Sequence, residues 1–110
     1  MTDENYKIEI FIPKEYLEEL REVLVKSNAG KHGNYDSCLS YSEVSGSWRP
    51  LEGANPFDGE IGVLKTSKEL KVEVTCPKKY VKEAIKNIKK VHPYEVPVIN
   101  IIPLANQYFE

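Results

Sequence analysis

The chain has 110 residues, of which 29% are charged, and a formal net charge of -2. A chain of this length buries roughly two thirds of its unfolded surface on folding, so it needs neither disulfides nor a metal to hold a core. The near-neutral balance is unlike the basic composition of most nucleic-acid and membrane-surface binders, and we expect neither as a partner. We expect one domain over residues 1–110.

Cysteine usage and the N-terminus indicate the cellular compartment. The first residues are polar and acidic, without the apolar stretch of a secretory signal. The two cysteines, Cys38 and Cys76, are expected to be free thiols. Nowhere does the sequence approach the roughly 20 apolar residues that a membrane-spanning helix needs. The sequence therefore indicates a cytoplasmic protein.

One strand-and-helix unit occurs twice. Residues 7–19 and 71–83 share an alternating apolar run, a proline, and a segment with helical spacing. Alternation is typical of a half-buried strand, and proline is favoured at the first position of a helix. In the first copy this pattern predicts a strand over 6–12 and a helix over 13–28, with Gly30 capping the helix end.

Between the two copies the pattern predicts a hairpin and then a long loop. Apolar residues alternate with polar ones from 34 to 44, Ser45-Gly46 offers a turn, and a short return strand follows at 47–50. Residues 51–62 hold three of the six glycines and an Asn-Pro step, which is typical of an ordered loop. A loop of this length inside a compact domain is often functional.

The second copy predicts a strand over 69–76 and a helix over 77–91. His92-Pro93 ends the helix, because proline disfavours helical conformation in the residue before it. The apolar stripe of this helix consists of Tyr80, Val81, Ala84, Ile85 and Ile88. A last strand is predicted over 96–104, and Pro97 within it indicates an edge or a bulge.

This order of elements predicts an α+β fold, the ferredoxin-like βαββαβ sandwich, in which two helices cover one face of an antiparallel sheet. The helix-to-strand turns at 30–34 and 92–94 are equivalent in the repeat. From that equivalence we expect both turns at the same end of the sheet, where their polar side chains would form one site. Function is expected where the copies differ, in 30–62 and 92–95.

Four segments have a composition that is unusual for a plain scaffold. They are Gly-Asn-Tyr-Asp-Ser-Cys at 33–38, Gly-Ser-Trp-Arg-Pro at 46–50, Leu-Glu-Gly-Ala-Asn-Pro-Phe at 51–57 and His-Pro-Tyr-Glu at 92–95. Together and in this order they resemble the YqfO-like family, also called NGG1p-interacting-factor-like. The resemblance runs from Lys7 to Leu104 and is to the small CutA-like domain of the GTP cyclohydrolase I type 2 homologs.

The resemblance implies a CutA/PII-like fold and assembly into a homo-oligomer, in particular a trimer. Stand-alone members of the family have about the length of this chain. The dinuclear metal site of the larger members belongs to a separate domain, so the resemblance implies no hydrolase activity here. We expect a ligand-sensing or regulatory module without catalysis of its own, and the sequence names neither its small-molecule ligand nor a cofactor.

The expected ligand site gathers the loop at 33–38, the loop around Asn55-Pro56 and the corner at 92–95, with Arg49 as a cation. The expected ligand-binding residues are Asn34, Tyr35, Asp36, Arg49, Asn55, His92, Tyr94 and Glu95. A structural interpretation competes with this one, in which His92 caps a helix and Asp36 closes a turn.

A rival hypothesis is a divalent metal ion bound by His32, Asp36, Cys38 and His92. Asp36 and Cys38 are two residues apart in a predicted strand, so their side chains would point to one face, with His32 nearby. The spacing matches no standard zinc motif. A third alternative is an enzyme with an unrecognised small-molecule reaction, although the two histidines of the chain give no nucleophile an evident paired base.

Overall fold

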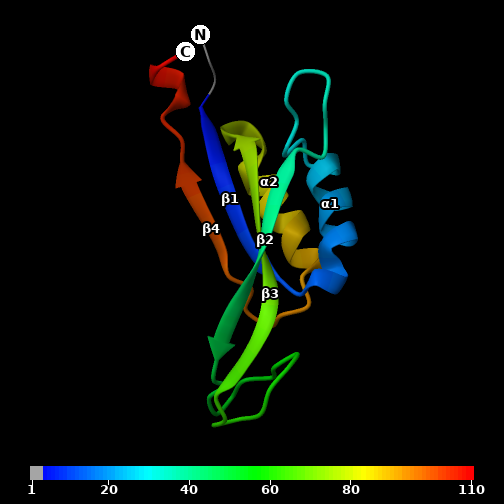
Figure 1. Ribbon diagram of the computed structural model, residues 1–110, viewed down its shortest axis with the longest axis vertical. Coiled ribbons are helices and arrows are strands. Elements are labelled where there is room, and N and C mark those ends of the chain that lie inside the picture. Colours follow the sequence, from blue (N-terminus) through cyan, green and yellow to red (C-terminus); the bar gives the residue numbers. More distant parts are fainter. Residues whose placement is uncertain (1–3) are drawn as a thin grey trace.

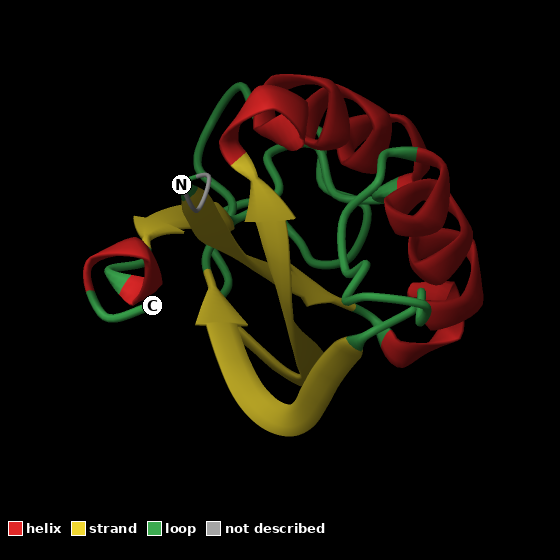
Figure 2. Ribbon diagram, turned by 90° about the horizontal axis from the view of Figure 1, so that it is seen from above, coloured by secondary structure: helices red, strands yellow, loops and turns green. Residues whose placement is uncertain are grey.

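A four-stranded antiparallel sheet with two helices on one face makes up the fold (Figure 1). The computed structural model describes residues 4–110. In chain order, the elements are β1 (Asn5–Ile12), a 3₁₀ turn (Lys14–Tyr16), α1 (Leu17–Lys26), β2 (Leu39–Trp48), β3 (Lys65–Pro77), α2 (Lys78–Val91), β4 (Ile99–Pro103) and a second 3₁₀ turn (Asn106–Tyr108). The strand order is β2-β3-β1-β4, and Figure 2 shows both helices on the same side of the strands. The predicted ferredoxin-like sandwich is confirmed.

The core forms because the alternating apolar residues of β1 and β3 face the helices together. The two strands are antiparallel, with Ile8 opposite Val74 and Ile10 opposite Val72. The fully buried apolar side chains are Ile8, Ile10, Ile12, Leu20, Leu24, Val72, Cys76, Ala84 and Ile88. Burial raises the pKa of the Cys76 thiol to about 11, so this cysteine acts as a core residue and not as a nucleophile.

Neither helix is long and apolar enough to cross a membrane, within the described residues.

Asn28, and not the predicted Gly30, ends the first helix. Asn28 has a φ of 60°, and the amide of Ala29 donates to the Leu24 carbonyl at 2.9 Å. This is a Schellman motif with asparagine in place of the more common glycine. Gly30, with a φ of 78°, instead lets the chain approach β3, where its amide donates to the Thr75 carbonyl at 2.8 Å.

β2 is one continuous strand, so the predicted turn at Ser45-Gly46 and return strand at 47–50 are wrong. The strand pairs with β3 over its whole length, and Gly46 lies opposite Ser67. A Cβ at Gly46 would collide with the Glu69 carboxylate, so the glycine permits close packing and does not mark a turn.

The predicted strand over 34–44 begins only at Leu39. Ser37 has a φ of 58°, which is incompatible with extended backbone, and it lies in the segment before the strand. In that segment the amides of His32 and Tyr35 each donate to the other residue's carbonyl, at 2.9 and 3.0 Å. Asp36 and Cys38 are therefore in a turn region and do not share a strand face.

β2 and β3 extend beyond the other strands as a two-stranded arm. β3 begins at Lys65, earlier than predicted, whereas β1 ends at Ile12 opposite Leu70. Residues 65–69 of β3 consequently pair with β2 alone among the described strands, and the loop 49–64 closes the arm at the bottom of Figure 1. The molecule is elongated as a result, with extents of 51 × 25 × 23 Å.

β4 is an edge strand, as Pro97 indicated, but it is shorter than the predicted 96–104. It begins at Ile99 and pairs with β1 alone among the described strands. Pro97 has no amide to donate, which explains why the ladder starts after it.

The two helix-to-strand turns lie at opposite ends of the sheet, so the expectation of a shared end is wrong. β1 and β3 are antiparallel, and equivalent turns of the two copies therefore point in opposite directions. The first turn contacts Thr75, near the end of β3, through Gly30. The second contacts Phe11, at the end of β1 that faces the arm, through His92. Figure 1 shows the first turn at the top of the molecule and the second beside the arm.

Candidate functional site

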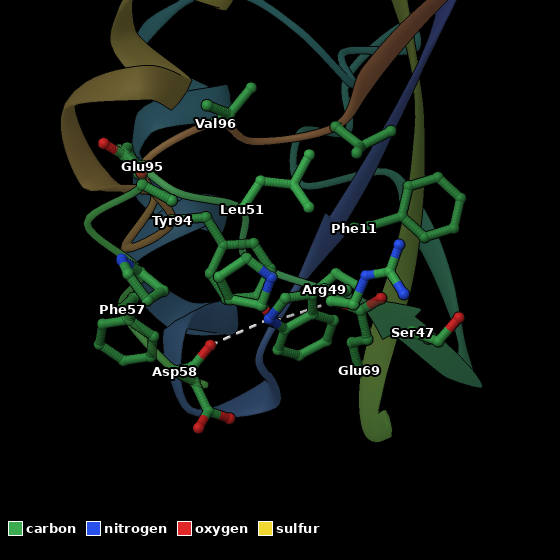
Figure 3. Close-up of a pocket in the computed structure, with 16 residues that line it drawn as sticks. Phe11, Ser47, Arg49, Leu51, Phe57, Asp58, Glu69, Tyr94, Glu95 and Val96 are labelled. Atoms are coloured by element: carbon green, nitrogen blue, oxygen red, sulfur yellow. Dashed lines mark hydrogen bonds between the residues drawn. The ribbon is translucent and has the colours of Figure 1, made fainter. Parts of the chain in front are cut away.

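A pocket of about 600 Å³ lies where three segments meet: the arm, the loop 49–64 and residues 92–98 between α2 and β4, which are called the corner from here on (Figure 3). This volume lies within the range of small-molecule sites. Most of its walls are apolar or aromatic, and they come from Phe11, Trp48, Pro50, Leu51, Ala54, Pro56, Phe57, Tyr94, Val96 and Val98. Its charged residues are Arg49, Asp58, Glu69 and Glu95. Such a composition, apolar walls with a few polar groups, is typical of a binding site.

Hydrogen bonds to main-chain carbonyls give the loop 49–64 a defined shape. The amide of Gly62 donates to the Pro50 carbonyl at 2.7 Å and closes the base of the loop. The indole nitrogen of Trp48 donates to the Asp58 carbonyl at 2.9 Å. Gly59 has a φ of 116°, which residues with a side chain rarely adopt, and a Cβ there would lie in tight contact with the Trp48 nitrogen, at 3.3 Å.

One hydrogen bond and one aromatic cluster connect the loop to the corner. The amide of Asn55 donates to the Glu95 carboxylate at 2.8 Å. The ring of Tyr94 lies 5.7 Å from that of Trp48 and 6.0 Å from that of Phe57, in tilted contacts. The pocket is thus assembled from segments that are far apart in the sequence.

His92 holds the corner against β1. Its Nε2 donates to the Phe11 carbonyl at 2.7 Å, and its Nδ1 accepts from the Tyr94 amide at 3.2 Å. These two partners require the neutral imidazole with the proton on Nε2. Burial lowers the pKa of His92, which favours the same neutral form. Both ring nitrogens are engaged, which leaves neither to a metal ion.

A buried acid and a phenol form the polar wall of the pocket. The Tyr94 hydroxyl donates to Oε2 of Glu69 at 3.0 Å, and Glu69 is only 8% exposed. Burial, followed by the hydrogen bond to Glu69, raises the pKa of Tyr94, so the phenol keeps its proton. Glu69 is not among the predicted site residues; its signal in the sequence is Gly46, a glycine inside a strand, which leaves room for the Glu69 carboxylate.

The structure divides the predicted site residues into two groups. The pocket is lined by Arg49, Tyr94 and Glu95. The main-chain amide of Asn55 donates to Glu95, and His92 does not line the pocket but holds the neighbouring corner to Phe11. The other expected ligand-binding residues lie at the opposite end of the sheet: Asn34, Tyr35 and Asp36. Within one chain, the two groups lie too far apart to contact the same small molecule.

The proposed metal ligands are not brought together. His32, Asp36 and Cys38 lie in the turn region before β2, whereas His92 is buried beside the arm. The Cys38 thiol contacts the Asp36 carbonyl oxygen at 3.6 Å and not its carboxylate. Across residues 4–110 no group of three or more His, Cys, Asp or Glu side chains is arranged to hold a metal ion.

The sheet order and the helix layer give the chain a CutA/PII-like fold. The structure of the periplasmic divalent cation tolerance protein CutA from Archaeoglobus fulgidus has a TM-score of 0.68 and 19% identity, over 92% of this chain and 84% of that one. The structure of the B. subtilis GlnK-ATP complex has a TM-score of 0.63 and 17% identity, over 94% of this chain and 86% of that one. These likenesses concern the fold.

Higher similarity connects the chain to one family. The GTP cyclohydrolase 1 type 2 homolog of Bacillus subtilis is 41% identical over 103 residues, and that of Halalkalibacterium halodurans is 37% identical over 106. The structure of a Bacillus cereus protein related to NIF3 has a TM-score of 0.83 and 32% identity over 96% of this chain. The resemblance to the YqfO-like, or NIF3-related, family that the motifs predicted is confirmed over nearly the whole chain.

The match concerns only part of the relatives. It covers 94% and 96% of this chain but 28% of the length of each of the two curated relatives, and 27% of the Bacillus cereus protein. No family model matches the chain. Any activity of the longer proteins is therefore not established for this chain.

Proposed function

We propose that the chain is a cytoplasmic regulatory module that senses a small molecule and has no catalysis of its own. The pocket between the arm and the corner is the proposed sensing site. The observation that carries the proposal is the composition of this pocket, in which apolar and aromatic walls surround a few polar groups.

The way in which the pocket is assembled supports a sensing role. Its walls come from the arm, the loop 49–64 and the corner, and a direct hydrogen bond from Asn55 to Glu95 connects the last two. A ligand that touches all three segments stabilises their present arrangement, because binding favours the conformation that offers the most contacts. The position of the arm then reports whether the pocket is occupied.

We propose that the module works as a homo-oligomer, and as a trimer by its family resemblance. Two features of the described residues support assembly. β2 and β4 each have an outer edge without a partner strand. Large apolar side chains are also exposed around the arm, namely Leu51, Phe57, Ile61, Val63, Leu64, Val96 and Val98.

A thermal-shift screen against a panel of metabolites tests the proposed site. Trp48 is the single tryptophan of the chain and lines the pocket, so its fluorescence reports binding there directly. We expect a compound that raises the melting temperature also to change Trp48 fluorescence. Phe57→Ala removes a pocket wall and should abolish both responses.

Ile61→Ala is the matched control, because Ile61 lies in the same loop outside the pocket and is similarly exposed, at 49% against 54% for Phe57. It should leave both responses unchanged. A panel in which no compound binds, or equal binding by the two variants, would contradict the proposed site.

A further inference from the structure

Glu69 has a buried carboxylate that the fold does not neutralise. It lines the pocket at 8% exposure, and its hydrogen-bond partner is the Tyr94 hydroxyl on Oε2. No lysine, arginine or histidine of residues 4–110 forms an ion pair with it. Burying a carboxylate without a cationic partner costs free energy, so the arrangement indicates a partner that is not part of this chain.

The position of this carboxylate is built into the strands. Oε1 of Glu69 occupies the space beside Gly46 where any other residue would have a Cβ. The backbone of Glu69 is fixed in β3, within the arm, and its carboxylate accepts from the hydroxyl of Tyr94 in the corner. The carboxylate therefore has a fixed position in the pocket wall.

Arg49 contributes the opposite charge to the same pocket. It directly follows β2 and lines the same pocket (Figure 3). Among the described residues its guanidinium forms no ion pair, either with Glu69 or with another carboxylate. One pocket thus presents a buried anion, Glu69, and a cation, Arg49, without ionic partners, beside Glu95, an exposed carboxylate that accepts from the Asn55 amide.

A zwitterion matches this pair of charges. A ligand with only an anionic group would leave Glu69 unpaired, and a ligand with only a cationic group would leave Arg49 unpaired. An α-amino acid offers its ammonium to Glu69 and its carboxylate to Arg49, whose planar guanidinium suits carboxylates. The remaining walls, including Leu51, Phe57 and Val96, are apolar and suit an apolar side chain.

We infer that the pocket binds a free α-amino acid with an apolar or aromatic side chain. This inference rests on the proposed sensing function and names the ligand class of the same site. Glu69 binds the ammonium group, Arg49 binds the carboxylate, and the aromatic rings beside Tyr94 enclose the side chain.

Calorimetric titration of the whole chain with L-phenylalanine and L-leucine tests the inference, with Trp48 fluorescence as the second readout. Two comparison compounds each lack one charge of phenylalanine: 3-phenylpropionate has no amine, and phenethylamine has no carboxylate. We expect phenylalanine to bind at least about tenfold more tightly than either, because each lost charge-assisted hydrogen bond weakens binding by about that factor.

Two variants, each of which removes one charge of the pocket, show which residue binds the ammonium group and which binds the carboxylate. Glu69→Gln should weaken phenylalanine and phenethylamine by about tenfold or more and leave 3-phenylpropionate unchanged. Arg49→Gln should weaken phenylalanine and 3-phenylpropionate and leave phenethylamine unchanged; Arg49 is exposed, so this variant leaves the core intact. Glu60→Gln, an exposed position in the same loop that does not line the pocket, is the control and should change nothing.

The outcomes separate the inference from the proposed function. Equal binding of phenylalanine and 3-phenylpropionate, or unchanged binding by Glu69→Gln, would overturn the inference. If neither amino acid binds but another compound of the metabolite panel changes Trp48 fluorescence, the inference fails and the sensing site stands. If no compound binds at all, both fail.

Discussion

Tyr94 joins the corner to the buried carboxylate of Glu69 through its hydroxyl. Tyr94→Phe keeps the ring and removes the donor, which leaves a buried oxygen without its partner. We expect the free energy of unfolding to fall by about 1–3 kcal/mol. Urea denaturation measures the change, and Tyr35→Phe, at a residue 75% exposed, should be silent. Equal stabilities of the two variants would show that the acid-phenol pair contributes nothing.

His92 makes the stability depend on pH. Burial lowers the pKa of its imidazole from the ordinary 6.5, against smaller opposing effects of the Phe11 carbonyl and the Glu69 carboxylate. As the pH falls, the unfolded chain takes up the proton first, so the stabilisation is complete above about pH 6.5 and is lost below it. We expect the free energy of unfolding to decrease from about pH 7.5 to about pH 5.5.

Urea denaturation of two histidine variants over this pH range shows whether His92 causes the pH dependence. His32→Gln should keep the pH dependence, because His32 is exposed. His92→Gln should lose it. The same pH dependence in both variants would place its origin elsewhere in the chain.

At the level of single residues, sequence motifs identified part of the pocket. Arg49, Tyr94 and Glu95 belong to segments whose composition is unusual for a scaffold, and they line the pocket. Glu69 could not be identified in the same way, because an acidic residue in an alternating strand is expected to be solvated. Its burial depends on Gly46 of the neighbouring strand and on Tyr94 of the corner, which are contacts between distant parts of the sequence.

At the scale of elements, α2 covers the sheet with Ala84 and Ile88, which are fully buried. The predicted stripe also included Ile85, which the structure leaves half-buried at the side of the helix. Ile88→Ala should lower the free energy of unfolding by about 2–5 kcal/mol because it opens a cavity, and Ile85→Ala should cost less. Lys86→Ala, on the exposed face, is the control. Urea denaturation that ranks Ile85 above Ile88 would contradict this placement of the helix.

Both strand-and-helix units were predictable, because alternation and the proline that follows are local signals. The turn at Ser45-Gly46 was not, since a glycine marks either a turn or a close approach, and only the partner strand decides between them. The expected meeting of the turns 30–34 and 92–94 was also wrong, and the antiparallel ferredoxin-like sheet predicted from the order of elements already excluded it. β1 and β3 prove to be antiparallel, which sends equivalent turns to opposite ends.

At the scale of the molecule, the arm and the two free sheet edges are the features that a single copy leaves uncovered. We expect an assembly larger than the 12.6 kDa of one chain, with three times that mass for the proposed trimer. Light scattering coupled to size-exclusion chromatography measures it. A monomer at micromolar concentration would contradict the assembly.

We propose that ligand binding takes place at the arm and not at the turn region before β2. Hydrogen–deuterium exchange, with and without a compound that raises the melting temperature, tests it most directly, because every peptide of the chain is followed at once. We expect slower exchange in the loop 49–64 and the corner 92–98, with residues 31–37 unchanged. Slower exchange in residues 31–37, with the loop and the corner unaffected, would contradict it.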